Sequence, residues 1–156
     1  MFTLIRWGSP IYQETINLRN QVLTESAGKP LIKDFPVEEK EDIHLVIKRE
    51  ERIIGTLLLH PCSKECIQIK QVAITPDCQN EGLGKKLLIY AEQVARTFGY
   101  ETIFLTGRQQ AWGFYEKLGY EELFEPYREK KLILKVFKKQ LQKTMNANKK
   151  ELKTNG

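Results

Sequence analysis

The feature that most constrains the fold is a strand that leads through a glycine-containing loop into a long amphipathic helix. Residues 65–75 alternate apolar and polar side chains with one register break, as a half-buried strand does. In residues 82–98 the apolar side chains recur at spacings of four, four, three and four, which keeps one helix face apolar. These side chains are Leu83, Leu87, Ala91, Val94 and Phe98, and Gly99 ends the helix. A strand followed by such a helix predicts an arrangement in which the helix packs on a sheet.

The remaining segments extend this pattern over most of the chain. Further strands are predicted over residues 2–6, 43–48, 52–60, 102–106, 120–124 and 131–137. Helices are expected over residues 10–25, which Pro10 opens, and over 109–118, with a polar connection at 31–42. Gly55 within a strand predicts a bulge. A hairpin start followed by strand–helix alternation predicts an α/β (α+β) fold, a mixed sheet of about six to seven strands flanked by helices.

The composition limits the class of protein. The 156 residues are enough for one ordinary domain, and 41% of them are hydrophobic, which excludes a wholly disordered chain. No apolar run is long enough to span a membrane, and the N-terminal residues lack the pattern of a signal peptide. The three cysteines are too few for a disulfide scaffold and fit a reducing compartment. We therefore expect a single cytoplasmic domain over residues 1–139, with no membrane partner.

The positive charge is concentrated at one end of the chain. The net charge is +5, but residues 128–156 carry ten basic and two acidic residues, a net +8, which leaves −3 for residues 1–127. Polar residues and lysines dominate after Lys139, so residues 140–156 are predicted to form a basic, frayed or disordered tail. Because charge runs at chain ends are usually solvated, a nucleic-acid partner is not expected, although a tail that binds nucleic acid stays a third hypothesis.

The loop before the long helix has the character of a phosphate site. Glycines allow a ligand to approach the backbone, and the free N–H groups of a helix N-terminus attract anions. The loop is not a Walker A motif, since Gln79 takes the place of the first glycine and Lys86 the place of Ser or Thr. It is not a Rossmann motif either, because Leu87 takes the place of the third glycine. The alternative is that the glycines only make the start of the helix more flexible and that no ligand binds there.

Two motifs in this region resemble those of the GNAT superfamily of N-acetyltransferases. The first is Gln79-x-x-Gly82-x-Gly84, preceded by the strand end Val-Ala-Ile-Thr-Pro. The second, at the family's spacing, begins at Ala111 and reads Ala-x-x-Phe-Tyr-x-x-x-Gly-Tyr, which ends at Tyr120. The resemblance implies acetyl-coenzyme A (acetyl-CoA) as co-substrate, bound in a cleft where two parallel strands splay apart.

The resemblance also implies which residues hold the cofactor. The backbone of Val72, Ala73 and Ile74 would pair with the pantetheine arm. The pyrophosphate would be held by backbone N–H groups of the loop and the helix start, namely Gln79, Asn80, Glu81, Gly82, Leu83, Gly84 and Lys85. An edge of unpaired backbone suits an amide-bearing arm, and a helix N-terminus suits a diphosphate.

The resemblance points to Tyr115 as the catalytic acid, because a neutral phenol can protonate the departing thiolate. A ring that only packs in the core or orients the cofactor is the alternative. The general base stays open: Gln68 stands where some family members have Glu, and Gln cannot accept the proton. Glu65, Glu81, other loop acids and a water chain are candidates, whereas structural roles are favoured for His44 and His60.

The acceptor side of the site is the least constrained. Candidate pocket residues are Trp7, Tyr12, Arg19, Phe35 and Trp112. Arg108 could meet an acidic substrate or a phosphate, and Arg19 could equally be a solvated helix residue. The acidic residues at 38–42 could attract a cationic amine, but a solvated loop is the favoured interpretation. Cys62 and Cys66 lack a second pair of metal ligands and Cys78 lacks neighbours that would activate it, so no metal and no nucleophilic cysteine are expected.

These observations predict an N-acetyltransferase in which a primary amine attacks the thioester of acetyl-CoA directly, in a ternary complex. The acceptor is expected to be a small-molecule amine, a polyamine or a protein amine, and the weakly acidic charge of residues 1–127 favours a cationic or neutral one. A homodimer is expected by analogy with the family. The alternative is a module of the same fold that binds or senses acyl-CoA without turning it over, which the Gln at position 68 keeps open.

Overall fold

The computed structural model describes residues 1–142, within which an eight-stranded sheet is flanked by helices. The strands are β1 (Phe2–Ile5), β2 (Ile43–Arg49), β3 (Arg52–Pro61), β4 (Cys66–Ile74), β5 (Thr102–Arg108), β6 (Glu121–Glu122), β7 (Tyr127–Glu129) and β8 (Leu132–Gln140). The helices are α1 (Pro10–Arg19), α2 (Leu83–Thr97) and α3 (Trp112–Lys117), with short helical turns between some elements. The predicted mixed α/β class is confirmed.

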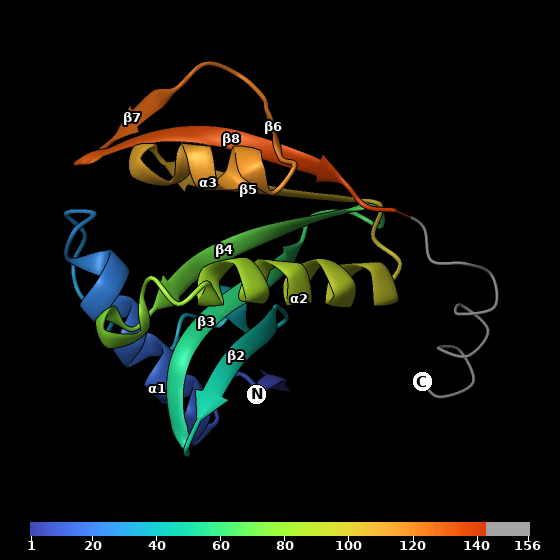
Figure 1. Cartoon of the computed structure of the whole chain (residues 1–156). Helices are drawn as coiled ribbons and strands as arrows, with labels where there is room; N and C mark the ends of the chain where they lie inside the picture. Colours follow the sequence, from blue (N-terminus) through green and yellow to red (C-terminus); the bar gives the residue numbers. More distant parts are fainter. Residues whose placement is uncertain (143–156) are drawn as a thin grey trace.

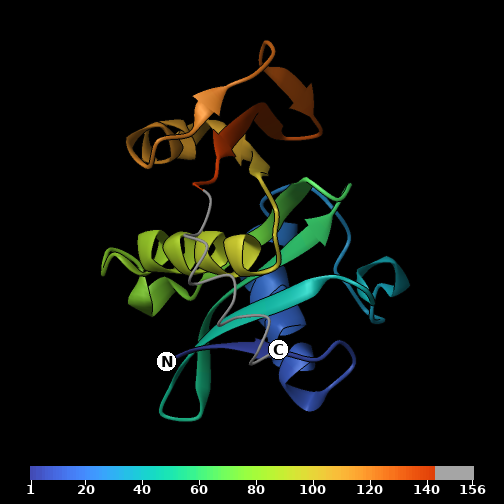
Figure 2. The same cartoon turned by 90° about the vertical axis from the view of Figure 1, so that its right-hand side faces the viewer.

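The sheet is antiparallel except at one junction. Its order is β1-β2-β3-β4-β5-β8-β6, with β7 also paired to β8, and only β4 and β5 run parallel among these pairs. Figures 1 and 2 show that β1–β4 with α1 and α2 form one half of the molecule, and β5–β8 with α3 form the other. The parallel junction between these halves is therefore where the site described below can open.

Strand alternation gives the sheet two apolar faces. Leu45 and Ile47 of β2 join the larger core, beneath α2 and α3, whereas Val46 between them belongs to a smaller cluster on the opposite face. In that smaller cluster Val46 packs with Leu18 of α1. Helices thus cover both faces of the sheet, as the apolar pattern of the strands requires.

Local sequence signals fix the ends of α1. The Ser9 hydroxyl caps the helix by accepting a hydrogen bond from the N–H of Tyr12, and Pro10 occupies the first turn, where its missing N–H is not needed. The helix continues as a π-helical turn over Asn20–Thr24, so the helical segment ends within a residue of the predicted boundary. Gly28, at φ 74°, lies just beyond it.

Both predicted irregularities of the strands are present. The register of β2 against β3 shifts beside Gly55, where a Cβ atom would lie 2.8 Å from Cδ1 of Ile74, so only glycine fits without a shift. The register of β3 against β4 shifts between Thr56 and Leu58, and Gln71 on β4 has the left-handed φ of 60°. This second bulge lies where β4 reaches the candidate site.

The C-terminal part differs from the prediction in three ways. The short strand β7 was not predicted, β6 covers two residues instead of five, and β8 runs to Gln140 instead of 137. Leu141 is buried in the core, so the folded part extends into the first residues of the expected tail. The rest of that tail, residues 143–156, lies outside the described residues. Among the described helices none has the length and apolar character that crossing a membrane requires.

Candidate active site

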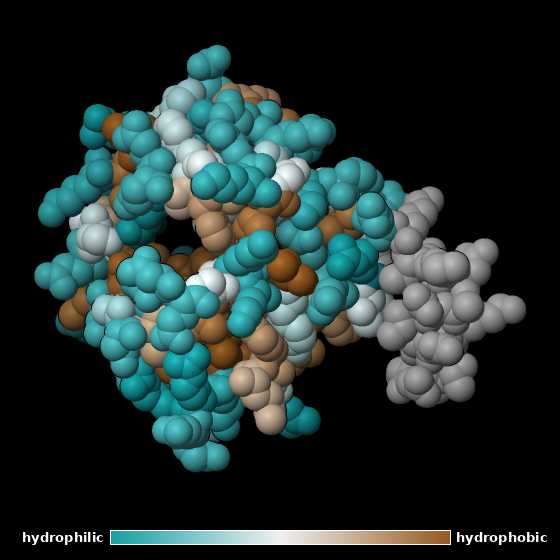
Figure 3. Space-filling view, in the orientation of Figure 1, coloured by the Kyte–Doolittle hydropathy of each residue, from teal (hydrophilic) through white to brown (hydrophobic). Residues whose placement is uncertain are grey.

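The site lies where β4 and β5 separate. The two strands are paired only over four residue pairs, from Cys66 with Thr102 to Ile69 with Leu105. Beyond Ile69, β4 continues to Ile74 beside β3, and β5 continues to Arg108 beside β8. A hollow of about 500 Å³ opens between the two strand ends, and Figure 3 shows the surface indented between the two halves. The splayed parallel pair that the resemblance implied is therefore present.

One wall of the hollow is the C-terminal part of β4. Gln68, Lys70, Gln71 and Val72 line it. Ala73 is buried on the opposite face of the sheet, so of the three residues expected to pair with the cofactor's arm only Val72 lines the hollow with its side chain. That expectation concerns the backbone, and this part of β4 has no strand beside it on the β5 side.

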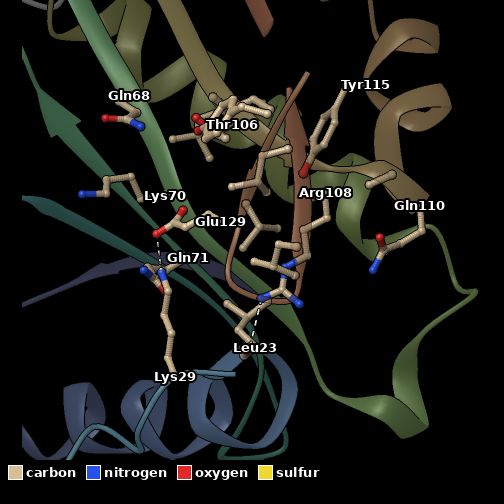
Figure 4. Close-up of a pocket in the computed structure, with 17 residues that line it drawn as sticks. Leu23, Lys29, Gln68, Lys70, Gln71, Thr106, Arg108, Gln110, Tyr115 and Glu129 are labelled. Carbon is tan, nitrogen blue, oxygen red and sulfur yellow. Dashed lines mark hydrogen bonds and ion pairs between the residues drawn. The ribbon is translucent and has the colours of Figure 1, made fainter. Parts of the chain in front are cut away.

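The opposite wall carries Tyr115. Its ring is 8% exposed and packs against Phe137 and Tyr120, and its hydroxyl points into the hollow toward Arg108 (Figure 4). Gly107 of β5 lies under this ring, where a Cβ atom would come within 2.7 Å of it. Burial raises the pKa of the Tyr115 hydroxyl, and the nearby Arg108 charge offsets part of that shift, so the phenol is neutral at pH 7 and can donate a proton.

The loop after β4 is held by its own side chains. The amide of Gln79 donates to the Ile74 carbonyl at 3.0 Å, and Asn80 and Gly82 take left-handed backbone angles of 71° and 76° before α2 begins. Lys85 is exposed on the first turn of the helix. A turn of this shape leaves the first N–H groups of α2 free to bind an anion.

Two arginines from the β2–β3 turn brace the same loop. Arg52 donates to the Asp77 carboxylate at 2.7 and 2.8 Å, and Arg49 pairs with Glu81 at 3.2 Å. The hydroxyl of Thr75 also donates to Asp77, and these two partners hold the pKa of Asp77 at about 2. Sequence reasoning missed this bracing because the partners lie about 25 to 32 residues apart.

Not all predicted cofactor residues meet in the hollow. Val72 and Tyr115 line it together, whereas residues 79–85 do not. They are nonetheless close to the second motif, since a Cβ atom on Gly84 would lie 3.5 Å from the ring of Phe114 in α3. The two sequence motifs thus meet where the N-terminus of α2 faces α3.

A second hollow of about 510 Å³ adjoins the first and shares lining residues with it, among them Lys70, Gln71 and Arg108. It extends to Arg19, Glu39 and His60. Glu129 on β7 is the one carboxylate within residues 1–142 that lines the first hollow, and it pairs with Lys29 at 3.4 Å. Sequence reasoning missed Glu129 because the three-residue strand that carries it gave no recognisable pattern.

The acidic-loop prediction holds for Glu38 and Glu41, which are exposed, and is wrong for Glu39 and Asp42. Glu39 is buried and accepts two hydrogen bonds of 2.7 Å from Arg19, so neither residue is solvated. The Asp42 side chain is also buried, and its carboxylate lies 2.7 Å from Nδ1 of His60. Buried carboxylates need such partners, which the sequence pattern did not reveal.

Three of the aromatic residues expected in the acceptor pocket pack together instead, with Tyr12 buried and Trp7 and Phe35 half-buried. Tyr12 is fully buried, its hydroxyl donates to Glu39 at 2.7 Å, and its ring packs against Trp7, Phe35 and His44. None of these four residues lines either hollow. The structural role expected of His44 is borne out, since its Nε2 bonds the Glu39 carbonyl at 2.8 Å.

Trp112 is also absent from the lining of both hollows. Its indole N–H donates to the Gly107 carbonyl at 2.8 Å, and the ammonium of Lys135 lies over its ring. Within residues 1–142 no group of three or more potential metal ligands occurs, and the three cysteines are free thiols.

Comparison with known proteins places these features in context. The family model described as "Acetyltransferase (GNAT) family" matches residues 9–120. A "Putative acetyltransferase" of Bacillus subtilis (strain 168) is 26% identical over 115 residues, which cover 70% of this chain and 76% of the relative. The crystal structure of a "putative N-acetyltransferase" from Lactobacillus plantarum is similar with a TM-score of 0.79 at 26% identity, covering 90% of this chain and 99% of the other.

A further structure, a GNAT family acetyltransferase from Elizabethkingia anophelis with acetyl-CoA bound, shares the fold at a TM-score of 0.68 and 19% identity, covering 90% of this chain and 97% of the other. These likenesses confirm the resemblance drawn from the two motifs and the fold that it implied.

Proposed function

Because this chain belongs to the GNAT family of acetyltransferases, we propose that it moves the acetyl group of acetyl-CoA to a primary amine by direct attack in a ternary complex. The observation that carries the proposal is the hollow between the splayed ends of β4 and β5, with the Tyr115 hydroxyl pointing into it. An unpaired strand edge on one wall and a proton donor on the other are what acyl transfer from a thioester needs.

The described residues fit acetyl-CoA along one continuous path. The backbone of Val72, Ala73 and Ile74, free on the β5 side, would bond the pantetheine amides as a neighbouring strand would. The residues from Gln79 to Gly84, where the first N–H groups of α2 are free, would hold the pyrophosphate, and Lys85 would add a positive charge. The thioester would then lie in the hollow beside Tyr115.

The chemistry follows from the placement of these groups. The neutral amine attacks the thioester carbonyl, a C–N bond forms, and a backbone N–H of β4 stabilises the developing oxyanion. The C–S bond then breaks and the thiolate takes the proton of the Tyr115 hydroxyl, which leaves CoA as the thiol. The proton lost by the amine passes to water, because Gln68 cannot accept it and Glu129 is engaged by Lys29. Tyr115 regains its proton from solvent.

The alternative is a module that binds acyl-CoA without turning it over, and Gln68 on the wall of the hollow is the observation that favours it. The three free thiols are consistent with our proposal that the protein works in a reducing, cytoplasmic compartment.

One experiment separates these functions. Calorimetric titration with acetyl-CoA tests binding, and release of the CoA thiol across a panel of neutral, cationic and anionic primary amines tests turnover. Binding with amine-dependent thiol release supports the transferase. Binding with no release above the rate without amine supports the sensing module, and absence of binding contradicts both.

A further inference from the structure

The Arg108 side chain crosses the open end of the cleft. It starts at the end of β5, and its guanidinium donates to the Ser26 hydroxyl at 2.8 Å. It also donates to the Leu23 carbonyl at 3.0 Å (Figure 4). These two residues follow α1, more than 80 positions earlier in the chain. Arg108 lines both hollows. It therefore lies between the first hollow, where the thioester is proposed to lie, and the second hollow, where the acceptor would enter.

The charge of Arg108 has no counter-ion in the described part of the chain. Arg19, Arg49 and Arg52 each pair with a carboxylate, whereas Arg108 bonds only neutral oxygens and forms no ion pair within residues 1–142. Of the five N–H donors of a guanidinium, two are used, which leaves three. The Nε atom has no hydrogen-bond partner within residues 1–142 and is not fully buried, so it remains available to a ligand.

Two of the carboxylates that line the hollows are in ion pairs with a lysine or arginine, Glu129 with Lys29 and Glu39 with Arg19, and Asp42 contacts His60. Glu38 lines the second hollow but not the first, and it forms no ion pair among the described residues. Lys70 lines both hollows beside Arg108 and also forms no ion pair among the described residues. The charged residues that line both hollows are Lys29, Lys70 and Arg108, and of these only Lys29 has an ion-pair partner among the described residues. Burial lowers the pKa of Arg108, although a guanidinium stays charged at any physiological pH.

We propose that the acceptor is a small amine that also carries an anionic group, a carboxylate or a phosphate, and that Arg108 binds this group. A partly buried guanidinium without a counter-ion gains most from an anion that can accept its planar, paired donors. Binding the anion beside Tyr115 would hold the amine of the same molecule near the thioester. This inference rests on the transferase function proposed above and adds the substrate class to it.

The test compares acceptors that differ only in charge. Glycine and β-alanine are measured against glycinamide and β-alaninamide, and phosphoethanolamine is measured against β-alanine to distinguish phosphate from carboxylate. Each is assayed by thiol release with the full-length wild type and with the variants Arg108→Gln, Arg108→Lys and Arg128→Gln. Arg128 lies on exposed β7, lines neither hollow and forms no ion pair among the described residues, so its loss controls for net charge.

We expect the wild type to prefer the anionic member of each pair, and Arg108→Gln to lower kcat/KM for anionic acceptors by about 10- to 100-fold. In the same variant, kcat/KM for the amides should change less than about threefold, and the KM for acetyl-CoA should stay the same. Arg108→Lys should recover part of the lost kcat/KM, and Arg128→Gln should have the activity of the wild type. An equal fall for acids and amides would mean that Arg108 only braces the fold, and a raised KM for acetyl-CoA would mean that it binds the cofactor. Either result overturns the proposal.

The failure of the two proposals can be told apart. If no amine in the panel causes thiol release, the transferase function itself fails. If release occurs without preference for anionic acceptors, the transferase stands and the substrate class is wrong.

Discussion

The guanidinium of Arg19 donates a hydrogen bond of 2.7 Å to each carboxylate oxygen of Glu39 inside the protein, although the two residues lie 20 positions apart in the sequence. The two side chains are only 4% and 11% exposed, and the Tyr12 hydroxyl donates to the same carboxylate. This network joins α1 to the connection before β2, and Arg19 and Glu39 both line the second hollow. It therefore sets the shape of the region where the second substrate is proposed to bind.

Removing one member of this pair should destabilise the protein strongly. Arg19→Met leaves the Glu39 carboxylate buried without its main partner, and we expect a loss of about 3 kcal/mol or more in the free energy of unfolding, measured in urea. Arg49→Met, which breaks a pair whose members are 48% and 43% exposed, should cost less than about 1 kcal/mol. Similar costs for the two variants would show that burial of the Arg19–Glu39 pair is not what matters.

The stability should fall in acid. Burial acts to raise the pKa of Glu39, but the hydrogen bonds and charge of Arg19 outweigh it, so the folded-state pKa is depressed, and that of Asp77 is about 2. A depressed folded pKa gives stability that is present above the unfolded value near 4 and lost as pH falls through the folded value. We expect the melting temperature to fall steadily below about pH 4, and Glu39→Gln to flatten that dependence. If the melting temperature of the variant fell with pH as steeply as that of the wild type, the acid sensitivity would belong to groups other than Glu39.

The Tyr115 hydroxyl should be needed for turnover but not for binding. Tyr115→Phe removes the proton donor and keeps the ring packed on Gly107, so we expect kcat to fall by about 100-fold or more while the Kd for acetyl-CoA stays within about threefold. Because burial raises the pKa of this hydroxyl, its ionisation should not reduce activity below about pH 10. Tyr90→Phe, on α2 beside Phe2 and far from the hollow's lining, is the matched control and should keep full activity.

A methyl group under the Tyr115 ring should disturb the site directly. In Gly107→Ala the new Cβ would lie 2.7 and 2.9 Å from ring carbons of Tyr115, which is too close, so the ring must move. We expect a loss of about 1–3 kcal/mol in stability and a fall in kcat. Gly113→Ala, in α3 with no atom within 4 Å of the new Cβ, should fold and work normally. Normal activity of Gly107→Ala would show that the placement of the ring is not critical.

The left-handed residue before α2 should matter for cofactor affinity. Gly82 has φ 76° with open space around it, so alanine adds backbone strain of about 1–2 kcal/mol and no clash. We expect Gly82→Ala to raise the Kd for acetyl-CoA several-fold, because strain there shifts the N–H groups proposed to hold the pyrophosphate. Gly8→Ala carries the same kind of strain at φ 80° outside both hollows and should leave the Kd unchanged. Parallel changes in the two variants would trace the effect to lost stability alone.

The parts of the fold that the sequence predicted well are those set by local pattern. The amphipathic spacing of α2, Ser9 and Pro10 at the start of α1, and Gly55 at a bulge each act within a few residues, so they can be read without the rest of the chain. The strand β7 escaped prediction because three exposed residues carry no periodicity, and its pairing with β8 determines it. Glu129 was missed together with that strand.

The residues of the candidate site were also predictable only where a local motif carries them. Tyr115 and the loop at Gln79–Gly84 lie in compact motifs, and the structure brings the end of this loop close to α3, which carries Tyr115, although the loop does not line the hollow. The partners of Arg19 and Arg108 could not be predicted, because each guanidinium meets a group 20 to 85 residues away in the sequence, a carboxylate for Arg19 and a backbone carbonyl for Arg108, only after the sheet has formed. Charge patterns along the chain do not tell which charges fold against each other.

The short junction of β4 and β5 also indicates where the gap between the two halves of the molecule can change in width. β2 with β3 and β5 with β8 each share seven residue pairs, whereas β4 and β5 share four. The two halves are also joined by the core, in which Phe137 packs with residues of α2, and by Glu92 of α2, which accepts hydrogen bonds from Tyr120 and Lys139. We therefore expect the gap to change in width at the unpaired ends of β4 and β5, where the Arg108 side chain crosses to Leu23, and this is the end at which the long, flexible acetyl-CoA is proposed to enter.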